Sequence, residues 1–274
     1  MIPAPFDYVR ADSAEAALAA LGEHGDEAKL MAGGQSLLPL MKLRLAMPTV
    51  VVDVSRASEL AYVRSAGDHV AIGALTRHCD VATDEAVRKE LPLLAHAAGS
   101  VGDPQVRHRG TIGGSLAHAD PSADLPAALL ALGASYVLRG PNGGREVAAE
   151  DFSTGFLETV LEPDELITEI RVPTGLQGWG YEKFTRRAID WATVAVAVAR
   201  RDNGTKVALA NMGATVLRAS GVEEALAGGA DPAAAAARAD EGTSPGNDVT
   251  ASADYRRHLA RVLTERALSA TGAS

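Results

Sequence analysis

The chain has 274 residues, 47% of them hydrophobic, and a net charge of −9, so it can bury a sizeable core. The negative charge would repel a nucleic-acid backbone, and no basic stripe with interleaved aromatic residues offsets it, which excludes nucleic acid as a partner. The N-terminus lacks the pattern of a secretory signal, and no segment is long enough to span a bilayer. We therefore expect a cytoplasmic protein, and a peripheral position at the inner face of the membrane stays open.

The single cysteine, Cys79, has no partner for an internal disulfide. It also cannot supply the paired thiolates that structural zinc or iron–sulfur clusters require. The histidines show no spacing typical of metal ligands. We therefore predict no metal site in this chain, and any iron–sulfur cluster must belong to another one.

The first part of the chain has the pattern of a small α/β unit. Apolar positions at helical spacing after Ser13, a residue suited to the N-cap, predict a helix over residues 13–23. A short apolar run over 28–31 is followed by a brief helix over 37–41 and a buried strand over 50–54.

The middle of the chain combines short strands with helices, as its glycine and proline residues and its alternating apolar runs indicate. The expected elements are two short strands within 60–75, a helix over 80–94, a second helical stretch over 93–99, a helix over 125–132, a hairpin over 134–152 and a strand over 166–172.

The glycine-rich residues 175–180 follow Pro173 and indicate a domain boundary or surface connection. The composition changes after this point. The expected elements beyond it are paired strands over 191–200 and 205–213 about an Asn203-Gly204 turn, an alanine-rich helix over 233–239 and a final helix over 255–270.

Two segments share one design. AGGQS at 32–36 and TIGGS at 111–115 each place two adjacent glycines and hydroxyl residues between a strand and a helix. Main-chain N–H groups at such turns bind anions, and glycine lets the main chain approach a ligand, so the two segments are suited to face one pyrophosphate. We expect Gly33 and Gly114 to keep side chains out of the pyrophosphate space. Neither segment is specific alone, because Gly-Gly-Ser also occurs in ordinary turns.

Asp124 follows the second glycine segment in HADPSADLP. Its carboxylate is suited to accept hydrogen bonds from a ribose or an adenine edge. It is equally suited to cap the helix that begins at Leu125 and Pro126. No G-x-G-x-x-G fingerprint follows a strand and no P-loop is present, so the sequence predicts no Rossmann-type nucleotide site.

Four segments carry a resemblance to a known family: AGGQSLLPLMKLRLAMP, TIGGSLAHADPSADLPAALLALGA, ELITEIRVP and YEKFTRRAIDWATVAVAVA. The chain resembles the medium, FAD-binding subunits of the molybdenum hydroxylases, most of all those of the aerobic carbon monoxide dehydrogenases. This resemblance implies an α+β fold with a vanillyl-alcohol-oxidase-type FAD-binding domain over 1–174. That domain would comprise an N-terminal α/β subdomain (1–55) and a second α+β subdomain (56–174). A C-terminal domain with an antiparallel sheet and flanking helices would occupy 175–274.

The resemblance also assigns cofactor-binding residues, with FAD between the first two subdomains. Asp124 would bind on the adenosine side, and Val101 and Ile167 would line the flavin. Lys183 would lie near the ring system, where a cation stabilises the reduced flavin. Trp191 stands where relatives have tyrosine, and an indole can still stack on the ring. The residues alone leave open a solvent-facing Lys183 and a Trp191 that packs between domains. The pyrophosphate would be held by Ala32, Gly33, Gly34, Gln35, Ser36, Thr111, Ile112, Gly113, Gly114 and Ser115.

The resemblance implies an electron-transferring oxidoreductase subunit with no acid–base catalytic residue of its own. A large partner subunit would oxidise the substrate at a molybdenum cofactor. A small partner subunit would pass the electrons through two-iron two-sulfur clusters to FAD, in a dimer of heterotrimers. The substrate stays open between carbon monoxide and an aldehyde, xanthine or N-heterocycle, and the external acceptor stays open between a quinone, oxygen and a nicotinamide. A stand-alone flavin oxidoreductase and a binding or assembly protein with purely structural glycine turns are the alternative classes.

Overall fold

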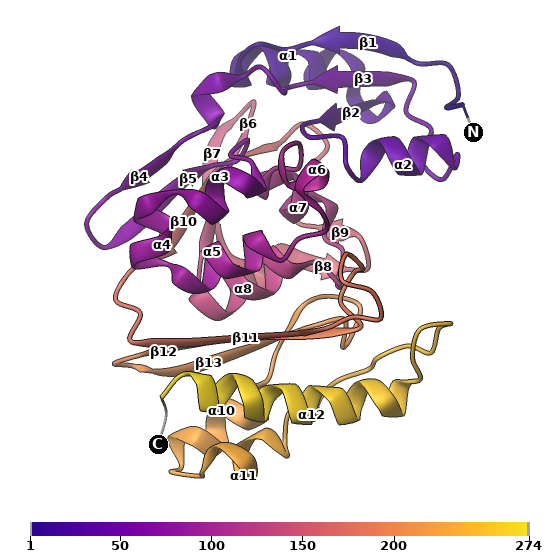
Figure 1. The fold of residues 1–274 in the computed structure, drawn as a ribbon. Coiled ribbons are helices and arrows are strands. Elements are labelled where there is room, and N and C mark those ends of the chain that lie inside the picture. Colours follow the sequence, from indigo (N-terminus) through magenta and orange to yellow (C-terminus); the bar gives the residue numbers. More distant parts are fainter. Residues whose placement is uncertain (1, 273–274) are drawn as a thin grey trace.

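The computed structural model of the chain describes residues 2–272. Its three larger sheets follow one another along the chain and lie one below the other in Figure 1, with helices between and around them. The largest hydrophobic cluster fills the space between the second and third of these sheets. The expected α+β class, with an α/β unit first and an antiparallel sheet with helices last, is confirmed.

The N-terminal unit is a parallel sheet of β1 (Asp7–Arg10), β2 (Ala28–Met31) and β3 (Val50–Asp53), in the order β1-β3-β2. α1 (Ala14–His24) packs on this sheet, and α2 (Leu37–Lys42) follows the first glycine segment, as predicted. β1 was not predicted, because this edge strand is mostly exposed and has no apolar run. Two short 3-10 helices complete the unit: η1 (Gly25–Glu27) and η2 (Ser58–Leu60).

The second sheet has five antiparallel strands in the order β4-β5-β10-β6-β7. The strand pair expected within 60–75 and the hairpin that turns at Pro141 and Asn142 are confirmed. The strands are β4 (Val63–Ser65), β5 (His69–Gly73), β6 (Ser135–Gly140), β7 (Gly143–Ala148) and β10 (Leu166–Pro173).

The single helix expected over 80–94 is wrong, because the chain is broken twice there. Asp84 is extended, and its carboxylate accepts the N–H of Ala86 at 2.9 Å as the cap of a new helix. Leu91 leaves the helical region before Pro92, which begins the next helix. The elements of this part are α3 (His78–Thr83), α4 (Glu85–Glu90), α5 (Pro92–Gly99), α6 (Pro104–Arg107), α7 (Ile112–His118), α8 (Asp124–Leu132), α9 (Ala149–Phe152), β8 (Ser153–Gly155) and β9 (Glu158–Thr159).

The third sheet is antiparallel, in the order β11-β12-β13-β14. The surface connection expected over residues 175–180 is wrong for its second half, because β11 begins at Gly178. A Cβ atom on Gly180 would stand 2.1 Å from the Ala267 carbonyl oxygen, so glycine lets the last helix lie directly on β11. The elements are β11 (Gly178–Phe184), β12 (Val194–Arg201), β13 (Gly204–Ala210), β14 (Leu217–Arg218), α10 (Ser220–Ala227), α11 (Pro232–Ala236) and α12 (Ala253–Ala270).

α8 lies between the second and third sheets, in contact with β10, β12 and β13. All of its residues are buried, and a helix that is apolar on every side is typical of one covered on both faces. Its first residue, Asp124, is therefore held at a buried junction between the two sheets. Within residues 2–272, no helix combines the length and apolarity needed to cross a bilayer.

Candidate functional site

A cleft of about 890 Å³ is lined by residues of all three parts of the chain. This volume falls in the range of cofactor-sized sites. Ile112 lies outside the cleft, because its side chain is fully buried in the core. The other predicted residues line it: Ala32, Gly33, Gly34, Gln35, Ser36, Val101, Thr111, Gly113, Gly114, Ser115, Asp124, Ile167, Lys183 and Trp191.

The first glycine turn, residues 32–36, has unused main-chain donors. Among the residues that the structure describes, no protein acceptor receives a hydrogen bond from the N–H groups of residues 33–36. Gly34 has a φ of +74°, a left-handed conformation that favours glycine. Gln35 turns its side-chain amide back to the Gly33 carbonyl, at 3.3 Å. Unpaired N–H groups along a cleft favour an anionic ligand.

The second glycine turn, residues 111–115, uses its N–H groups within the protein. Those of Ile112 and Gly113 donate to carbonyl oxygens just beyond β5, at 3.0 and 2.8 Å. The Thr111 hydroxyl accepts the N–H of Gly114 at 3.2 Å, as the cap of α7. The next N–H donates to the Thr111 carbonyl. This segment, which forms the first turn of α7, therefore docks the helix on the second sheet, and the N–H groups of residues 112–115 are already used within the protein.

The two glycine turns touch each other. A Cβ atom on Gly33 would stand 2.1 Å from the carbonyl oxygen of Arg109, just before the second turn. A Cβ atom on Gly114 would stand 2.8 Å from the Thr111 hydroxyl oxygen and 3.9 Å from the Ala32 Cβ atom. The expectation that these glycines clear space for a pyrophosphate is therefore wrong. They make room for protein atoms, and so bring the two turns side by side.

Asp124, Tyr181 and Lys183 form a buried polar cluster where α8 meets β11. The Asp124 carboxylate accepts the Tyr181 hydroxyl at 2.5 Å and the Lys183 ammonium at 2.9 Å. Lys183 also donates to the Ser100 carbonyl at 3.1 Å. Asp124 makes no capping bond to α8, whose N-cap is Ala123, so the capping interpretation is wrong. The solvent-facing alternative for Lys183 is wrong as well, since its side chain is only 11% exposed.

Burial controls the protonation of this cluster. It raises the pKa of Asp124 above its ordinary value, against the opposing effects of the Lys183 ammonium and the Tyr181 hydroxyl. Burial and the neighbouring carboxylate raise the pKa of Tyr181 well above 10, so its hydroxyl remains a donor. Lys183 donates to the Asp124 carboxylate and the Ser100 carbonyl and also lines the cleft, so its buried positive charge faces the space for a ligand.

The cleft wall on the C-terminal side is the connection between β11 and β12. Ile189 and Trp191 project from it, with 60% and 57% of their surfaces exposed, and both line the cleft. This exposure contradicts the alternative in which Trp191 packs between domains. Val101 and Ile167 line the cleft from the second subdomain. An exposed indole that lines the same cleft as a buried ammonium is suited to cover a conjugated ring.

Sequence reasoning missed the position of His78, which lies beneath the second glycine turn. A Cβ atom on Gly110 would stand 2.7 Å from the His78 ring, and the main-chain N–H of His78 donates to the Gly110 carbonyl. The ring is buried, and its Nδ1 atom has no partner within residues 2–272. Burial lowers the pKa of His78 to about 4. Nothing in the sequence indicated this buried position, because His78 has no spacing typical of metal ligands.

These features fit an extended, anionic ligand that carries a ring, such as FAD. The unpaired N–H groups of residues 33–36 are suited to a pyrophosphate, and Lys183 with Trp191 to a flavin. Among the described residues, no group of three or more His, Cys, Asp and Glu side chains is arranged to hold a metal ion.

Comparisons with known proteins identify the family. The FAD binding domain in molybdopterin dehydrogenase matches residues 4–175, and the CO dehydrogenase flavoprotein C-terminal domain matches residues 179–271. The chain is 44% identical to the carbon monoxide dehydrogenase medium chain of Hydrogenophaga pseudoflava, over 100% of this chain and 99% of that protein. It is 40% identical to the 6-hydroxypseudooxynicotine dehydrogenase complex subunit alpha of Paenarthrobacter nicotinovorans, over 98% of this chain and 95% of that protein.

A solved structure agrees with these matches. The carbon monoxide dehydrogenase from Hydrogenophaga pseudoflava that lacks the Mo-pyranopterin moiety of the molybdenum cofactor superposes with a TM-score of 0.96, at 45% identity. The superposition covers 100% of this chain and 99% of that chain. The chain therefore belongs to the molybdenum hydroxylase family, as an FAD-binding medium subunit of its oxidoreductases.

Proposed function

We propose that this chain is the electron-transferring FAD subunit of a carbon monoxide dehydrogenase complex. The observation that carries this proposal is the cleft that connects the unpaired N–H groups of residues 33–36 with the buried ammonium of Lys183. When bound, FAD supplies the redox chemistry. The residues of this chain bind the cofactor, orient it and adjust its electrostatic surroundings.

The pyrophosphate belongs on the first glycine turn in this proposal, because its N–H groups are the unpaired ones. Thr111 and Ser115 of the second turn add hydroxyl groups along the same cleft wall. The flavin ring belongs at the Lys183 end, under Trp191 and between Val101 and Ile167. A cation there stabilises the reduced ring and raises its reduction potential.

Asp124 belongs to the ring end as well. Its carboxylate lies 2.9 Å from the Lys183 ammonium, so both side chains meet the same part of a ligand. An extended dinucleotide cannot place its adenosine half against one and its ring against the other. We therefore propose that Asp124 belongs to the surroundings of the flavin ring, and not to the adenosine side that the family resemblance implies.

The proposal assigns substrate oxidation to a large partner subunit with a molybdenum cofactor. Two-iron two-sulfur clusters in a small partner subunit deliver the electrons to this chain, and a quinone, oxygen or a nicotinamide then accepts them. The single cysteine supports this division, because the chain cannot build such a cluster itself. A dimer of heterotrimers is the proposed assembly.

The test is the composition of the protein purified from its native host by a tag on this chain. We expect FAD in its visible spectrum, together with molybdenum and iron carried by one larger and one smaller subunit. Flavin without metals or partners would indicate a stand-alone oxidoreductase. A protein that holds no flavin even after incubation with FAD would overturn the proposal altogether.

The substrate has its own test. Carbon monoxide is supported by the 44% identity to a medium chain named for it and by the TM-score of 0.96 with a carbon monoxide dehydrogenase. We expect carbon monoxide to bleach the flavin absorbance of the purified complex under anaerobic conditions. Bleaching by an N-heterocycle or an aldehyde, and not by carbon monoxide, would reassign the substrate and leave the FAD subunit role intact.

A further inference from the structure

We propose that Asn211 and Arg256 are positioning residues that fix the wall segment 189–191 against the flavin ring. The inference rests on the proposed function, which places the ring at the Lys183 end of the cleft. Neither residue lines the cleft, and both act through the main chain of Ala192 and Thr193. They determine where Trp191 stands.

Asn211 connects the two segments that flank the ring end. Its side-chain amide donates to the Ala192 carbonyl at 2.7 Å, directly after Trp191. Its main-chain N–H donates to the Pro121 carbonyl at 2.7 Å, in the loop that leads to Asp124. Asn211 has a φ of +61°, a left-handed conformation that asparagine tolerates better than most residues. One strained residue thus ties the segment before Asp124 to the segment after Trp191.

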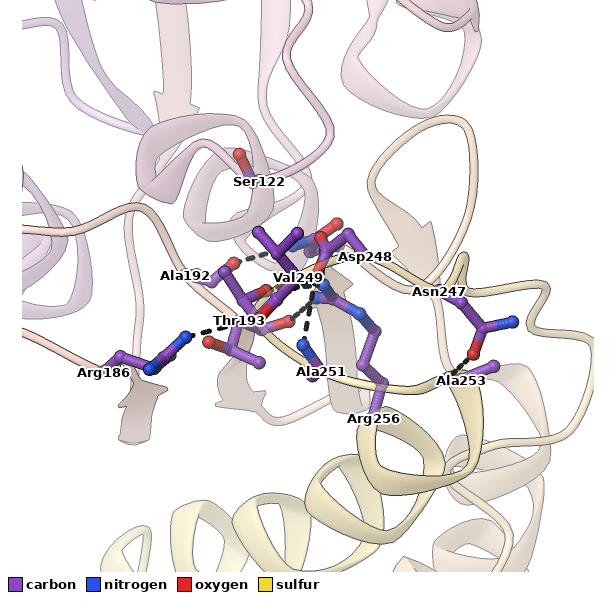
Figure 2. A network of polar contacts seen from close by, with 12 residues as sticks. Ser122, Arg186, Ala192, Thr193, Asn247, Asp248, Val249, Ala251, Ala253 and Arg256 are labelled. Carbon is purple, nitrogen blue, oxygen red and sulfur yellow. Dashed lines mark hydrogen bonds and ion pairs between the residues drawn. The ribbon is translucent and has the colours of Figure 1, made fainter.

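Arg256 holds the next carbonyl along the chain. Its guanidinium donates to the Thr193 carbonyl, to the Asp248 carboxylate at 2.6 Å and to the Thr250 hydroxyl at 3.1 Å. Figure 2 shows Arg256 reaching from α12 to Thr193, with Asp248 beside it. The arginine side chain is only 2% exposed. A buried guanidinium that has three acceptors is rigid, because leaving any of them unpaired is costly.

The loop around Asp248 strengthens this clamp. The Asp248 carboxylate also accepts the main-chain N–H groups of Thr250 and Ala251, at 2.7 and 3.0 Å. Arg186, in the wall segment's own connection, donates to the Val249 carbonyl at 3.3 Å. The connection between β11 and β12 is therefore tied to the rest of the C-terminal part before Trp191, at Arg186, and after it, at Ala192 and Thr193. Figure 2 shows these three anchoring residues.

Within residues 2–272, the hydrogen bonds and ion pair of the wall segment itself are all local. The N–H of Asp190 donates to the Arg187 carbonyl, and their side chains form an exposed ion pair. Ala192 and Thr193, in contrast, are almost completely buried. Their carbonyl groups precede β12 and are taken up by side chains. The chain can therefore leave the sheet at this point and carry Trp191 outward to the cleft. The two side-chain bonds anchor it there, together with the main-chain bond from the Thr193 N–H to the Phe184 carbonyl at 2.8 Å.

The variant Asn211→Gly tests this inference, because glycine keeps the left-handed backbone and its N–H and removes only the bond to Ala192. The experiment uses the FAD-loaded complex from the native host, with Trp191→Phe and the double variant beside it. The measurements are the reduction potential of the flavin and its fluorescence lifetime, which an indole in contact shortens.

We expect Asn211→Gly to retain FAD and to lengthen the flavin lifetime and shift the potential in the same direction as Trp191→Phe. The double variant should add little to Trp191→Phe alone, because both changes act through the same contact. Additive changes, or an Asn211→Gly protein with the lifetime and potential of the wild type, would overturn the inference. If Trp191→Phe itself changes neither quantity, the placement of the ring in the proposed function is wrong.

Asn247→Ala is the matched control. It removes another asparagine side-chain bond in the same region, from the N–H of Ala253 at 2.7 Å, without touching the Ala192 or Thr193 carbonyl. We expect reduced thermal stability and an unchanged flavin potential. Arg256→Lys provides a second variant, since it keeps the charge beside Asp248 and loses the forked geometry. It should shift the flavin readouts less than Arg256→Met, because an ammonium can still donate to part of the acceptors that the guanidinium holds. Wild-type readouts for Arg256→Met would contradict a positioning role for Arg256.

Discussion

The two glycine turns contain similar residues and use their main chains differently. After β2, the N–H groups of residues 33–36 find no acceptor in the described part of the chain, whereas those of residues 112–115 all donate to protein acceptors. The flanking structure explains the difference, because α7 is pressed onto the end of β5 while the first turn projects from the edge of its sheet toward the cleft. A Gly-Gly-hydroxyl pattern therefore indicates a close main-chain approach and does not say whether the neighbour is a ligand or the protein.

The largest expected effect comes from Gly33→Ala, at the point where the two turns touch. A Cβ atom there would stand 2.1 Å from the Arg109 carbonyl oxygen, and this main-chain atom cannot move aside cheaply. We expect the free energy of unfolding to fall by about 3 kcal/mol or more, at the upper end for overpacking. FAD should be lost during gel filtration. Urea unfolding and the flavin absorbance of the purified protein measure both effects.

Gly22→Ala, within α1, is the control for that substitution. Apart from its chain neighbours and the backbone of α1 itself, no described atom lies within 4 Å of the position that its Cβ would occupy. It should leave FAD content unchanged and stabilise the helix by up to about 1 kcal/mol. If Gly33→Ala behaves like this control, the contact between the two turns does not depend on glycine.

The second expected effect is a loss of stability at acid pH. Protonation of His78, which packs beneath the second turn, should cause it. Burial lowers the pKa of His78 from 6.5 to about 4, so the unfolded chain binds the proton more readily than the folded one. The neutral His78 ring therefore makes its full contribution to the free energy of unfolding above about pH 6.5. This contribution is lost as the pH falls toward 4. It amounts to about 3 kcal/mol across this range.

Urea unfolding as a function of pH checks this prediction, with His78→Phe as the comparison. The variant has no titrating ring at this site, so its stability should fall less steeply between pH 6.5 and 4 than that of the wild type. Parallel curves for the two proteins would show that acid destabilises the chain through other groups.

The features that follow from local pattern were predictable from the sequence. The apolar run of β3, the hairpin at Pro141 and Asn142 and the apolar helix α8 could all be located from residue type and spacing. The family resemblance supplied a set of candidate residues, and all of them except Ile112 line one cleft. Their roles in binding FAD stay predictions.

The features that depend on distant contacts were not predictable. Asp124 pairs with Lys183 across 59 positions of the chain, so its spacing suggested a helix cap where the fold makes a buried ion pair. The glycines of β11 have the composition of a surface connection. The reason for glycine there is close packing against the main chain of the distant helix α12, which the local sequence does not reveal. The N–H groups of the two turns could be told apart only once their acceptors were in place.

The third expected effect concerns the ring end of the cleft, where Lys183→Met removes the cation. The remaining Asp124 carboxyl can take up a proton, since burial already raises its pKa, so the fold should persist. FAD binding should weaken by about 2 kcal/mol, the contribution of a charged hydrogen bond. The reduction potential of the residual flavin should fall. Lys183→Arg keeps the charge, and its potential should stay closer to that of the wild type.

The smallest expected effect separates the two turns most sharply. Thr111→Val removes the hydroxyl that caps α7 and keeps a side chain suited to the extended backbone there, so stability should fall by about 1 kcal/mol. Ser36 makes no capping bond to α2, so Ser36→Ala should leave stability unchanged. Because the first turn holds the pyrophosphate in our proposal, Ser36→Ala should instead weaken FAD binding by about 1 kcal/mol. Thermal unfolding of the apoprotein and FAD titration distinguish these effects, and equal responses of the two variants in both measurements would contradict the division of roles between the turns.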